Sequence, residues 1–388
     1  MAGNGVPYCR PAGIASEVIM ISNMKAVCVT AVFVAAAVLT FAMIARPDAN
    51  ERDRRNHLGH FKKVDGISIS SGGGQLTFTG CGHRDFPGCT IYRYDLKENA
   101  LYRYVHENKL MQVMGAQYWS DSRQFLLVTV PRTEDGKQVL EQMQVAIMNP
   151  DGTGLKQLTA GEGIKAAYML SPDGRTLVYA SGKRRTEGKT VASHFDYYAR
   201  DLATGTETQI TDLAFYEIST PYFTPDGKNI VFNYGSPLKL PGTNDDRADK
   251  AFREDYEKKH RWNNIIRYPV DGSGINSLPE PWFVHGIGSS NAIITRDGSL
   301  WFEGRTGGIS YYRRYPNGEI NEFPYAQRGN GPERYIFSWT VDPAGSWMAI
   351  LYQDYGSERD RWVAVLDTSA RTRIPVLLPD TITNITVH

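Results

Sequence analysis

The fold is decided by the stretch Ser171-Pro172-Asp173-Gly174-Arg175-Thr176-Leu177-Val178-Tyr179-Ala180. In its Pro-Asp-Gly turn the proline fixes φ, the aspartate caps the backbone and the glycine takes a positive φ. The apolar residues 177–180 predict a short strand after the turn, and residues 166–170 predict one before it. The stretch therefore predicts a β-hairpin with a tight turn.

The same hairpin recurs along the chain. Residues 224–232 repeat it closely, and weaker copies span 120–127, 295–302 and 341–348, with a worn first copy at 70–78. Successive copies lie roughly 45–70 residues apart, a period typical of β-propeller blades. One blade cannot bury both of its faces alone, so neighbouring blades stack and closure of the ring protects their edges.

A second hairpin motif follows the first in phase. It spans residues 146–159, 198–211 and 266–278 in three successive repeats. Two hairpins make four strands, so the sequence predicts an all-β, six-bladed β-propeller of four-stranded blades over residues 61–388. The alternating residues 381–387 predict one further strand that helps to close the ring.

These paired motifs resemble the TolB-like propeller repeats of bacterial envelope proteins, over about residues 60–380. The resemblance implies the architecture but not an activity, because propellers serve as lyases, peptidase lids and binding modules alike. TolB has an extra α/β domain before its propeller. Too few residues lie between the apolar segment at 26–44 and the first predicted strand for such a domain, so we expect it to be missing.

Composition and motifs limit the function. With 388 residues, a net charge of +1 and 22% charged residues, the chain is ordinary for a globular protein and lacks the basic balance of a nucleic-acid binder. A Gly-x-Ser-x-Gly elbow, a His-Glu-x-x-His pair, a phosphate-binding glycine loop and a paired zinc-cysteine pattern are all absent from the sequence. We therefore predict no catalytic residue, no metal and no cofactor.

The first 60 residues read as a leader and a linker. Residues 1–23 predict a disordered or untranslated leader, since Met24 is the better start, and residues 24–45 predict a signal peptide or membrane anchor around the uncharged stretch 26–44. Residues 46–60 form a charged linker. Its four arginines outnumber Lys25 and favour the opposite orientation, so cleavage and anchoring in the inner membrane both stay open.

Two cysteines lie in the predicted propeller. Cys81 and Cys89 flank the loop 82–88 of the first blade, where opposed positions at a hairpin neck can form a disulfide. A disulfide fits an oxidising compartment, and we expect export to the periplasm or cell envelope. The alternative is a pair of free buried thiols.

Topology predicts where a ligand binds. If the first strand of each blade runs down the channel, the Asp-Gly turns lie on one face and the long loops gather on the other, which is called the top face here. A short helix is predicted in the fourth-blade insertion at 238–262, and the basic run 183–189 is expected to be a solvated loop tip. The candidate binding residues of these loops are Tyr216, Glu217, Phe252, Tyr256, Trp282, Phe283, His285, Arg334 and Tyr335.

The sequence favours a monomeric, non-catalytic binding or scaffold module of the envelope. Its partner would be a protein, a peptide or a glycan held by the top-face loops, and not nucleic acid. The alternative is a propeller-scaffold enzyme, such as a polysaccharide lyase or hydrolase. A third possibility is a propeller lid whose catalytic domain is another polypeptide.

Overall fold

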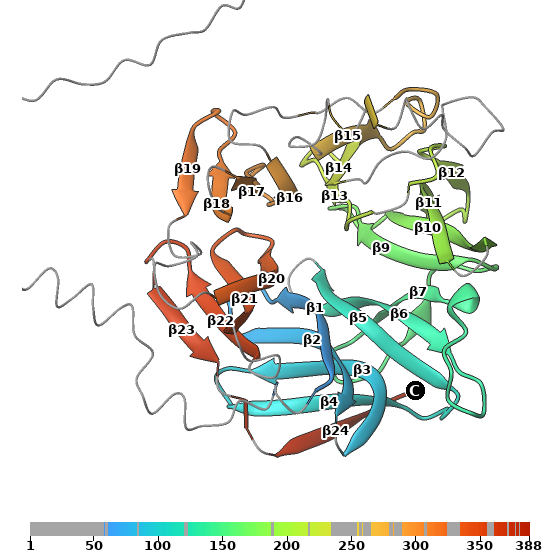
Figure 1. Cartoon of the computed structure of the whole chain (residues 1–388), viewed down its shortest axis with the longest axis vertical. Helices are drawn as coiled ribbons and strands as arrows, with labels where there is room; N and C mark the ends of the chain where they lie inside the picture. Colours follow the sequence, from blue (N-terminus) through green and yellow to red (C-terminus); the bar gives the residue numbers. More distant parts are fainter. Residues whose placement is uncertain are drawn as a thin grey trace, which may run out of the picture. The chain divides into compact units, whose positions relative to one another are not determined.

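The computed structural model divides the chain into units 1–55 and 56–388, and its described residues all belong to the second unit. They are residue 58 and residues 61–388 without 84, 120–122, 188–189, 216–217, 234–253, 256–257, 259–264, 279–281, 283–288, 306–308, 324–333, 355–360, 371, 377 and 380. Within this unit six sheets, antiparallel apart from one terminal strand of the first, form the blades of an all-β propeller (Figure 1).

Each sheet follows the chain order from the channel outward. Blade 1 contains β1 (Lys63–Ile69), β2 (Gln75–His83), β3 (Phe86–Asp95) and β4 (Ala100–His106). Blade 2 contains β5 (Met111–Trp119), β6 (Gln124–Pro131), β7 (Gln144–Met148) and β8 (Lys156–Gln157), with the short 3₁₀ helix η2 (Leu140–Gln142) between β6 and β7. Blade 3 contains β9 (Ile164–Leu170), β10 (Thr176–Glu187), β11 (Thr190–Asp201) and β12 (Glu207–Gln209).

The second half of the ring repeats this plan. Blade 4 contains β13 (Tyr222–Phe223), β14 (Asn229–Asn233) and β15 (Ile265–Pro269). Blade 5 contains β16 (Ser289–Ile294), β17 (Leu300–Arg305), β18 (Ile309–Arg314) and β19 (Ile320–Phe323). Blade 6 contains β20 (Arg334–Val341), β21 (Trp347–Asp354), β22 (Arg361–Asp367) and β23 (Thr372–Val376), and β24 (Ile382–Val387) ends the chain.

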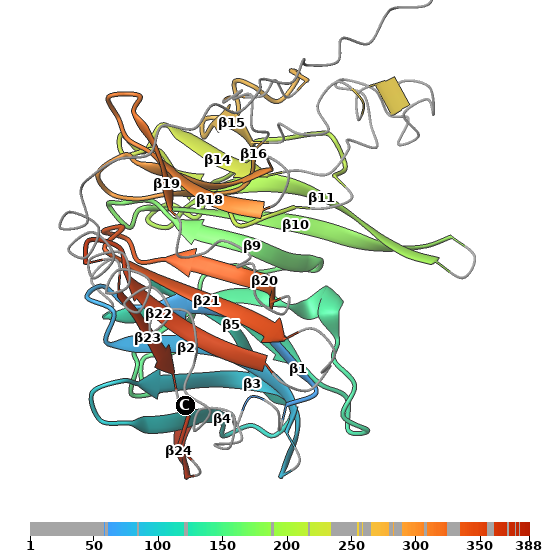
Figure 2. The same cartoon turned by 60° about the vertical axis from the view of Figure 1, so that its left-hand side comes forward.

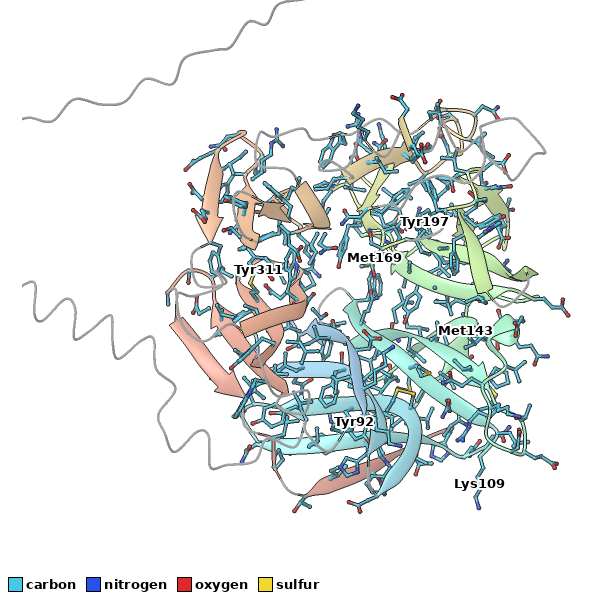
Figure 3. The ribbon with its side chains drawn as sticks, viewed as in Figure 1. Tyr92, Lys109, Met143, Met169, Tyr197 and Tyr311 are labelled. Atoms are coloured by element: carbon cyan, nitrogen blue, oxygen red, sulfur yellow. A yellow bond between two sulfur atoms is a disulfide. The ribbon has the colours of Figure 1, made fainter. Side chains whose placement is uncertain are left out.

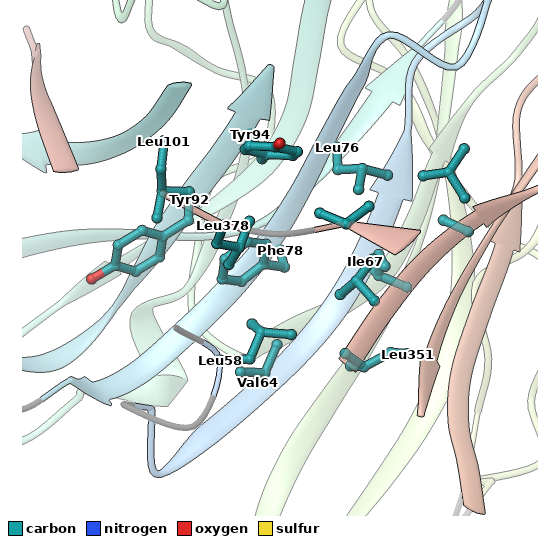
Figure 4. Close-up of a cluster of buried hydrophobic side chains, with 14 of the residues drawn as sticks. Leu58, Val64, Ile67, Leu76, Phe78, Tyr92, Tyr94, Leu101, Leu351 and Leu378 are labelled. Atoms are coloured by element: carbon teal, nitrogen blue, oxygen red, sulfur yellow. The ribbon is translucent and has the colours of Figure 1, made fainter. Parts of the chain in front are cut away.

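The core is divided among the six junctions between blades. One cluster of buried apolar side chains fills each junction, because the central strands are packed on both faces. In β6, for example, residues 125–130 are all buried, whereas the two residues of the outer strand β8 are exposed. The junction of blades 1 and 6 closes the ring, with Phe78 and Tyr92 on one side and Leu351 on the other (Figure 4).

The chain end adds a second closure. Strand β24 pairs in parallel with β4, with Ile382 beside Leu101, so blade 1 has five strands. Its Val387 is fully buried in the cluster between blades 1 and 2. The predicted terminal strand is thus confirmed, and it holds the end of blade 6 to the outer edge of blade 1.

Asp-Gly turns end the inner strands of blades 3, 4 and 5, as the sequence predicts, and turn glycines of blades 1 and 3 also approach the neighbouring blade. Gly174 has φ +73°, and a Cβ there would lie 2.8 Å from Cη2 of Trp119 in blade 2. At the ring closure, Gly73 approaches the indole of Trp347 in blade 6 so closely that a Cβ would lie 2.3 Å from Cδ2. Glycine is therefore required here by both its dihedral angles and its neighbour.

Four strands in every blade was a wrong prediction, since the described blades have three to five. In blade 4, the described residues of the expected fourth strand form turns, in which the amides of Ile275 and Ser277 donate to the carbonyls of Gly272 and Gly274. These local bonds use backbone groups that a fourth strand would need. The helix predicted at 238–262 lies outside the described residues, apart from Glu254, Asp255 and Lys258.

The predicted leader, membrane segment and most of the linker also lie outside the described residues. In the part of the chain that the structure describes, no helix is long and apolar enough to cross a membrane.

Candidate functional site

The candidate site is the central channel. A cavity of about 750 Å³ is lined by the innermost strand of all six blades, namely β1, β5, β9, β13, β16 and β20. One end is marked by Lys63 and Lys165, where these strands begin, and the other by the turn residues Pro172, Pro225 and Pro343. The first strand of each blade therefore runs along the channel, as expected. In Figure 3, Met169 of β9 lies beside the central opening.

A β-bulge at a similar height shapes the wall in five of the six inner strands. The register of β1, β5, β9, β16 and β20 shifts there by one residue against the next strand. In four of them the bulge contains a residue with positive φ, namely Gly66, Gly115, Ala167 or Asn291. Such a bulge turns the strand and changes where its side chains point, so the residues beyond it are presented differently to the channel.

Polar side chains from the preceding blade satisfy two of these bulges. The amide of Gly115 donates to Oγ1 of Thr79 (2.8 Å), and Oγ1 of Thr77 donates to the carbonyl of Ala116 (2.9 Å). At the junction of blades 4 and 5, the amide of Ala292 donates to Oδ1 of Asn233 (3.1 Å). These backbone groups already have hydrogen-bond partners inside the protein, which hold the wall in place. Some of the polar groups of the wall are therefore not available to a ligand.

The wall is mainly apolar and aromatic, with Met114, Tyr118, Trp119, Tyr168, Tyr222 and Trp339 among its residues. The hydroxyl of Tyr168 donates to the carbonyl of Gly115, and Nε1 of Trp339 donates to Oε1 of Glu303 (2.7 Å). Burial raises the pKa of Tyr168 well above its ordinary value, so its phenol stays neutral at physiological pH. The aromatic rings therefore offer packing surface and not acid–base chemistry.

The one buried lysine of the wall has a structural role. Nζ of Lys165 donates to the carbonyls of Gly161 (2.9 Å), Glu162 (2.8 Å) and Gly163 (3.3 Å), which occupies all three of its protons. Burial lowers the pKa of Lys165. Nearby, Nζ of Lys63 forms an exposed ion pair with Asp65 at 2.6 Å. Lys165 thus closes the connection between blades 2 and 3.

Asp342 is a buried carboxylate at the other end of the wall. Its Oδ1 accepts the amides of Ser346 (2.7 Å) and Trp347 (2.8 Å), which caps the turn of blade 6. In blade 3, the hydroxyl of Ser171 accepts the corresponding amide of Thr176. Oδ2 of Asp342 is buried and has no hydrogen-bond partner among the described residues. The hydroxyl of Ser171 shows that one acceptor oxygen is enough to cap such a turn, and the carboxylate of Asp342 has a second oxygen that the turn does not use.

The disulfide predicted from the sequence is confirmed, and it lies at the channel. Cys81 and Cys89 are register partners in β2 and β3, with an S–S distance of 2.08 Å. Cys81 also belongs to the channel wall, opposite Lys63 of β1. The disulfide therefore fixes the hairpin of blade 1 at the end where the inner strands begin.

The candidate binding residues of the top-face loops are mostly untested. Trp282 is half-buried, its amide donates to the carbonyl of Ile265, and the guanidinium of Arg267 lies 5.7 Å from its ring centroid, so it packs on blade 4. Arg334 and Tyr335 begin the inner strand β20, and their side chains are not described. The remaining candidates lie outside the described residues, namely Tyr216, Glu217, Phe252, Tyr256, Phe283 and His285.

The predicted loop 82–88 and the predicted loop that contains the basic run 183–189 both belong to extended hairpins. The segment 82–88 is mostly strand, with His83 paired to Phe86, and the segment 182–195 belongs almost entirely to β10 and β11. The channel wall was not predicted as a site from the sequence. Gly66 and Gly115 were the available signal, because an isolated glycine within a strand pattern indicates a bulge or a close approach.

No group of three or more His, Cys, Asp or Glu side chains in the described part of the chain is placed to hold a metal ion. The predictions of no catalytic residue and no cofactor stay predictions.

The chain was compared with known proteins by sequence and by structure. No protein-family model matches the chain. A stretch of 63 residues is 37% identical to dipeptidyl-peptidase 5 of Porphyromonas endodontalis, which covers 16% of this chain and only 9% of that relative's length.

Three solved structures illustrate the range of similar propeller proteins. They are TolB from Acinetobacter baumannii (TM-score 0.49, 13% identity, 84% of this chain and 65% of that chain), oligogalacturonate lyase from Vibrio parahaemolyticus (0.48, 16%, 84% and 79%) and a puromycin-hydrolysing peptidase from Mycobacterium tuberculosis (0.48, 10%, 84% and 56%). The described residues form a six-bladed β-propeller.

Proposed function

We propose that this chain is an exported, non-catalytic binding module of the bacterial cell envelope. The channel receives the end of a protein, peptide or glycan partner, and the top-face loops contact the rest of it. The observation that supports this proposal is the cavity of about 750 Å³, which lies within the usual size range of ligand sites. Its wall combines aromatic surface with a few fixed polar groups, as ligand pockets do.

Two of the groups that suggest chemistry in this wall, the amine of Lys165 and the phenol of Tyr168, are already engaged. Lys165 spends its protons on three carbonyls, and the neutral hydroxyl of Tyr168 donates to Gly115. This supports a binding module over the alternative, a propeller-scaffold lyase or hydrolase. In the same proposal, the segment 26–44 anchors a monomeric propeller to the inner membrane, and a helical insertion at 238–262 contributes Phe252 and Tyr256 to the contact.

Filling the channel tests this proposal. Ser338 is a half-buried residue of the channel wall, and Ser277 is an exposed serine of blade 4. We expect Ser338→Trp to remove most of the capture of envelope components from a native extract, and Ser277→Trp to leave it intact. Matching melting curves of the two variants would show that the propeller is folded. Equal capture by both folded variants would contradict a channel site.

A further inference from the structure

The turn between β20 and β21 of blade 6 (Figure 2) is built differently from its counterparts in other blades. In blade 3, the hydroxyl of Ser171 accepts one turn amide (2.9 Å) and Oδ1 of Asp173 accepts another (3.1 Å). In blade 4, Oγ1 of Thr224 and Oδ1 of Asp226 each accept the corresponding amide at 3.1 Å. A hydroxyl residue followed two positions later by an aspartate thus closes such a turn.

In blade 6, the acidic residue occupies the other position. Asp342 takes the place of the hydroxyl residue, and the exposed Ala344 takes the place of the aspartate. Oδ1 of Asp342 accepts both turn amides, from Ser346 (2.7 Å) and Trp347 (2.8 Å). One carboxylate oxygen therefore closes the turn, and the second oxygen is not used for it.

The second oxygen of Asp342 is a buried acceptor in the channel wall. Asp342 lines the cavity and is fully buried, and its Oδ2 has no hydrogen-bond partner among the described residues. Most buried polar atoms in folded proteins have a partner, and burying a charge without one costs free energy. Since Thr224 closes the same turn in blade 4 without this cost, the turn alone does not explain the carboxylate.

The wall near Asp342 suits a positively charged group. Tyr222 of β13 and Trp339 of β20 line the channel. Both pack against the apolar cluster that contains Val341, the residue before Asp342. The faces of aromatic rings attract cations, Trp most strongly, and their surface also packs on an alkyl chain. An ammonium group on an alkyl chain therefore matches both the carboxylate and the aromatic surface at this end of the channel.

The basic residues of the wall leave Oδ2 of Asp342 without a hydrogen bond. They are Lys63, Lys165 and Arg296. Lys63 pairs with Asp65 (2.6 Å), Lys165 donates its protons to three carbonyls, and both lysines lie where the inner strands begin. Arg296 is exposed and donates no hydrogen bond to this oxygen. The carboxylate is therefore available to a cation of the ligand.

We infer that the channel selects an alkylammonium group of its partner, such as a lysine side chain, and that Asp342 attracts this group. The inference rests on the proposed function, in which the channel receives the end of a partner, and adds the charge of that end. Water is largely excluded from the wall around Asp342, so the attraction between the two charges is only weakly screened. The ammonium is therefore favoured at this end even without a direct hydrogen bond to the buried oxygen.

A double variant removes the carboxylate and keeps the turn. Asp342→Thr with Ala344→Asp gives blade 6 the arrangement of blade 4 and leaves the net charge of the chain unchanged. Asp342→Asn is a second variant, which keeps one acceptor oxygen for the turn. Asp367→Asn is the matched control, because Asp367 caps the outer turn of blade 6 and does not line the cavity. Melting curves of the full-length chain show which variants are folded.

Two small probes of equal chain length, hexylammonium and hexanol, separate charge from apolar packing. Ligand-observed NMR with the full-length chain gives their dissociation constants. We expect the parent chain to bind hexylammonium roughly tenfold more tightly than hexanol, because only hexylammonium carries a charge. Both Asp342 variants should bind the two probes equally, whereas Asp367→Asn should keep the preference of the parent chain. Ser338→Trp, which fills the channel, should abolish the binding of both probes.

Three outcomes would overturn the inference. It fails if the parent chain does not prefer hexylammonium to hexanol, or if the folded Asp342 variants keep the preference. Calcium binding that depends on Asp342, without binding of hexylammonium, would assign the carboxylate to a metal ion and overturn it as well. The capture of envelope components, and its loss in Ser338→Trp, tests the proposed function independently of these probes.

Discussion

At the scale of single residues, the turn glycines show why a local motif also controls the ring. Gly174 and Gly227 occupy the same position of two Pro-Asp-Gly turns and have similar φ values, +73° and +68°. A Cβ at Gly174 would meet Trp119 of the neighbouring blade at 2.8 Å, whereas a Cβ at Gly227 would meet no atom within 4 Å. The two sites thus separate backbone strain from contact between blades.

Substituting these two glycines measures both effects. We expect Gly227→Ala to lower the free energy of unfolding by about 1 kcal/mol through positive-φ strain, and Gly174→Ala by about 2–3 kcal/mol because the indole must also move. Urea denaturation of the two variants measures the difference. Equal losses would contradict the role of Gly174 in the junction of blades 2 and 3.

Asp196 of β11 is a second residue whose environment makes a prediction. Its Oδ1 accepts Oγ1 of Thr211 (2.9 Å) and the amide of Leu213 (2.7 Å), which holds the connection to blade 4. Burial raises the pKa of Asp196 to about 6, against hydrogen bonds that lower it. A folded pKa above the unfolded value of 3.8 favours the protonated form in the folded protein.

The pH dependence of unfolding tests this environment. The contribution of the protonated Asp196 carboxyl to the free energy of unfolding is fully present below about pH 4. About 2–3 kcal/mol of it is lost as the pH rises to about 6. Asn keeps the acceptor oxygen but cannot ionise. The stability of Asp196→Asn relative to the parent chain should therefore rise between these pH values and then level off. A difference that does not vary with pH would show that burial does not control this carboxyl.

At the scale of elements, β24 is the clearest case of a strand whose partner lies far away in sequence. Val387 is fully buried between blades 1 and 2, whereas Ile374 of β23 is 41% exposed. We expect Val387→Ala to destabilise the chain by roughly 2 kcal/mol and Ile374→Ala by less than about 0.5 kcal/mol. Chemical denaturation provides the comparison. If Val387→Ala cost no more than Ile374→Ala, β24 would not close the ring.

The same contrast explains how much of the fold could be predicted. The Asp-Gly turns and the strands beside them were predictable, because turn type and hydrophobic pattern are local properties of the sequence. The site of β24 on blade 1 depends on a distant partner, which no local pattern contains. The hairpin 182–195 was predicted as a loop because its run of basic residues lacks the alternation of apolar and polar residues that indicates a strand.

At the scale of the whole molecule, the six junctions explain why the binding site belongs to the ring. Each junction has its own apolar cluster, and the channel exists only because all six inner strands converge on it. Its wall could not be predicted from the sequence, since its residues come from positions as distant as Lys63 and Asp342. The aromatic residues of the loops were predicted as binding residues because of their residue type. The channel wall was not predicted, although the topology of a propeller also brings the inner strands together.

Site-specific photo-crosslinking in the native host tests the channel most directly. A photoreactive phenylalanine analogue replaces Met169 in the channel wall, and the control replaces Lys228, an exposed turn residue of blade 4. We predict that Met169 yields one dominant adduct with an envelope protein, peptide or glycan, that Lys228 does not, and that Ser338→Trp abolishes the adduct. A channel position that yields no adduct, while the control position captures the partner, would contradict the account.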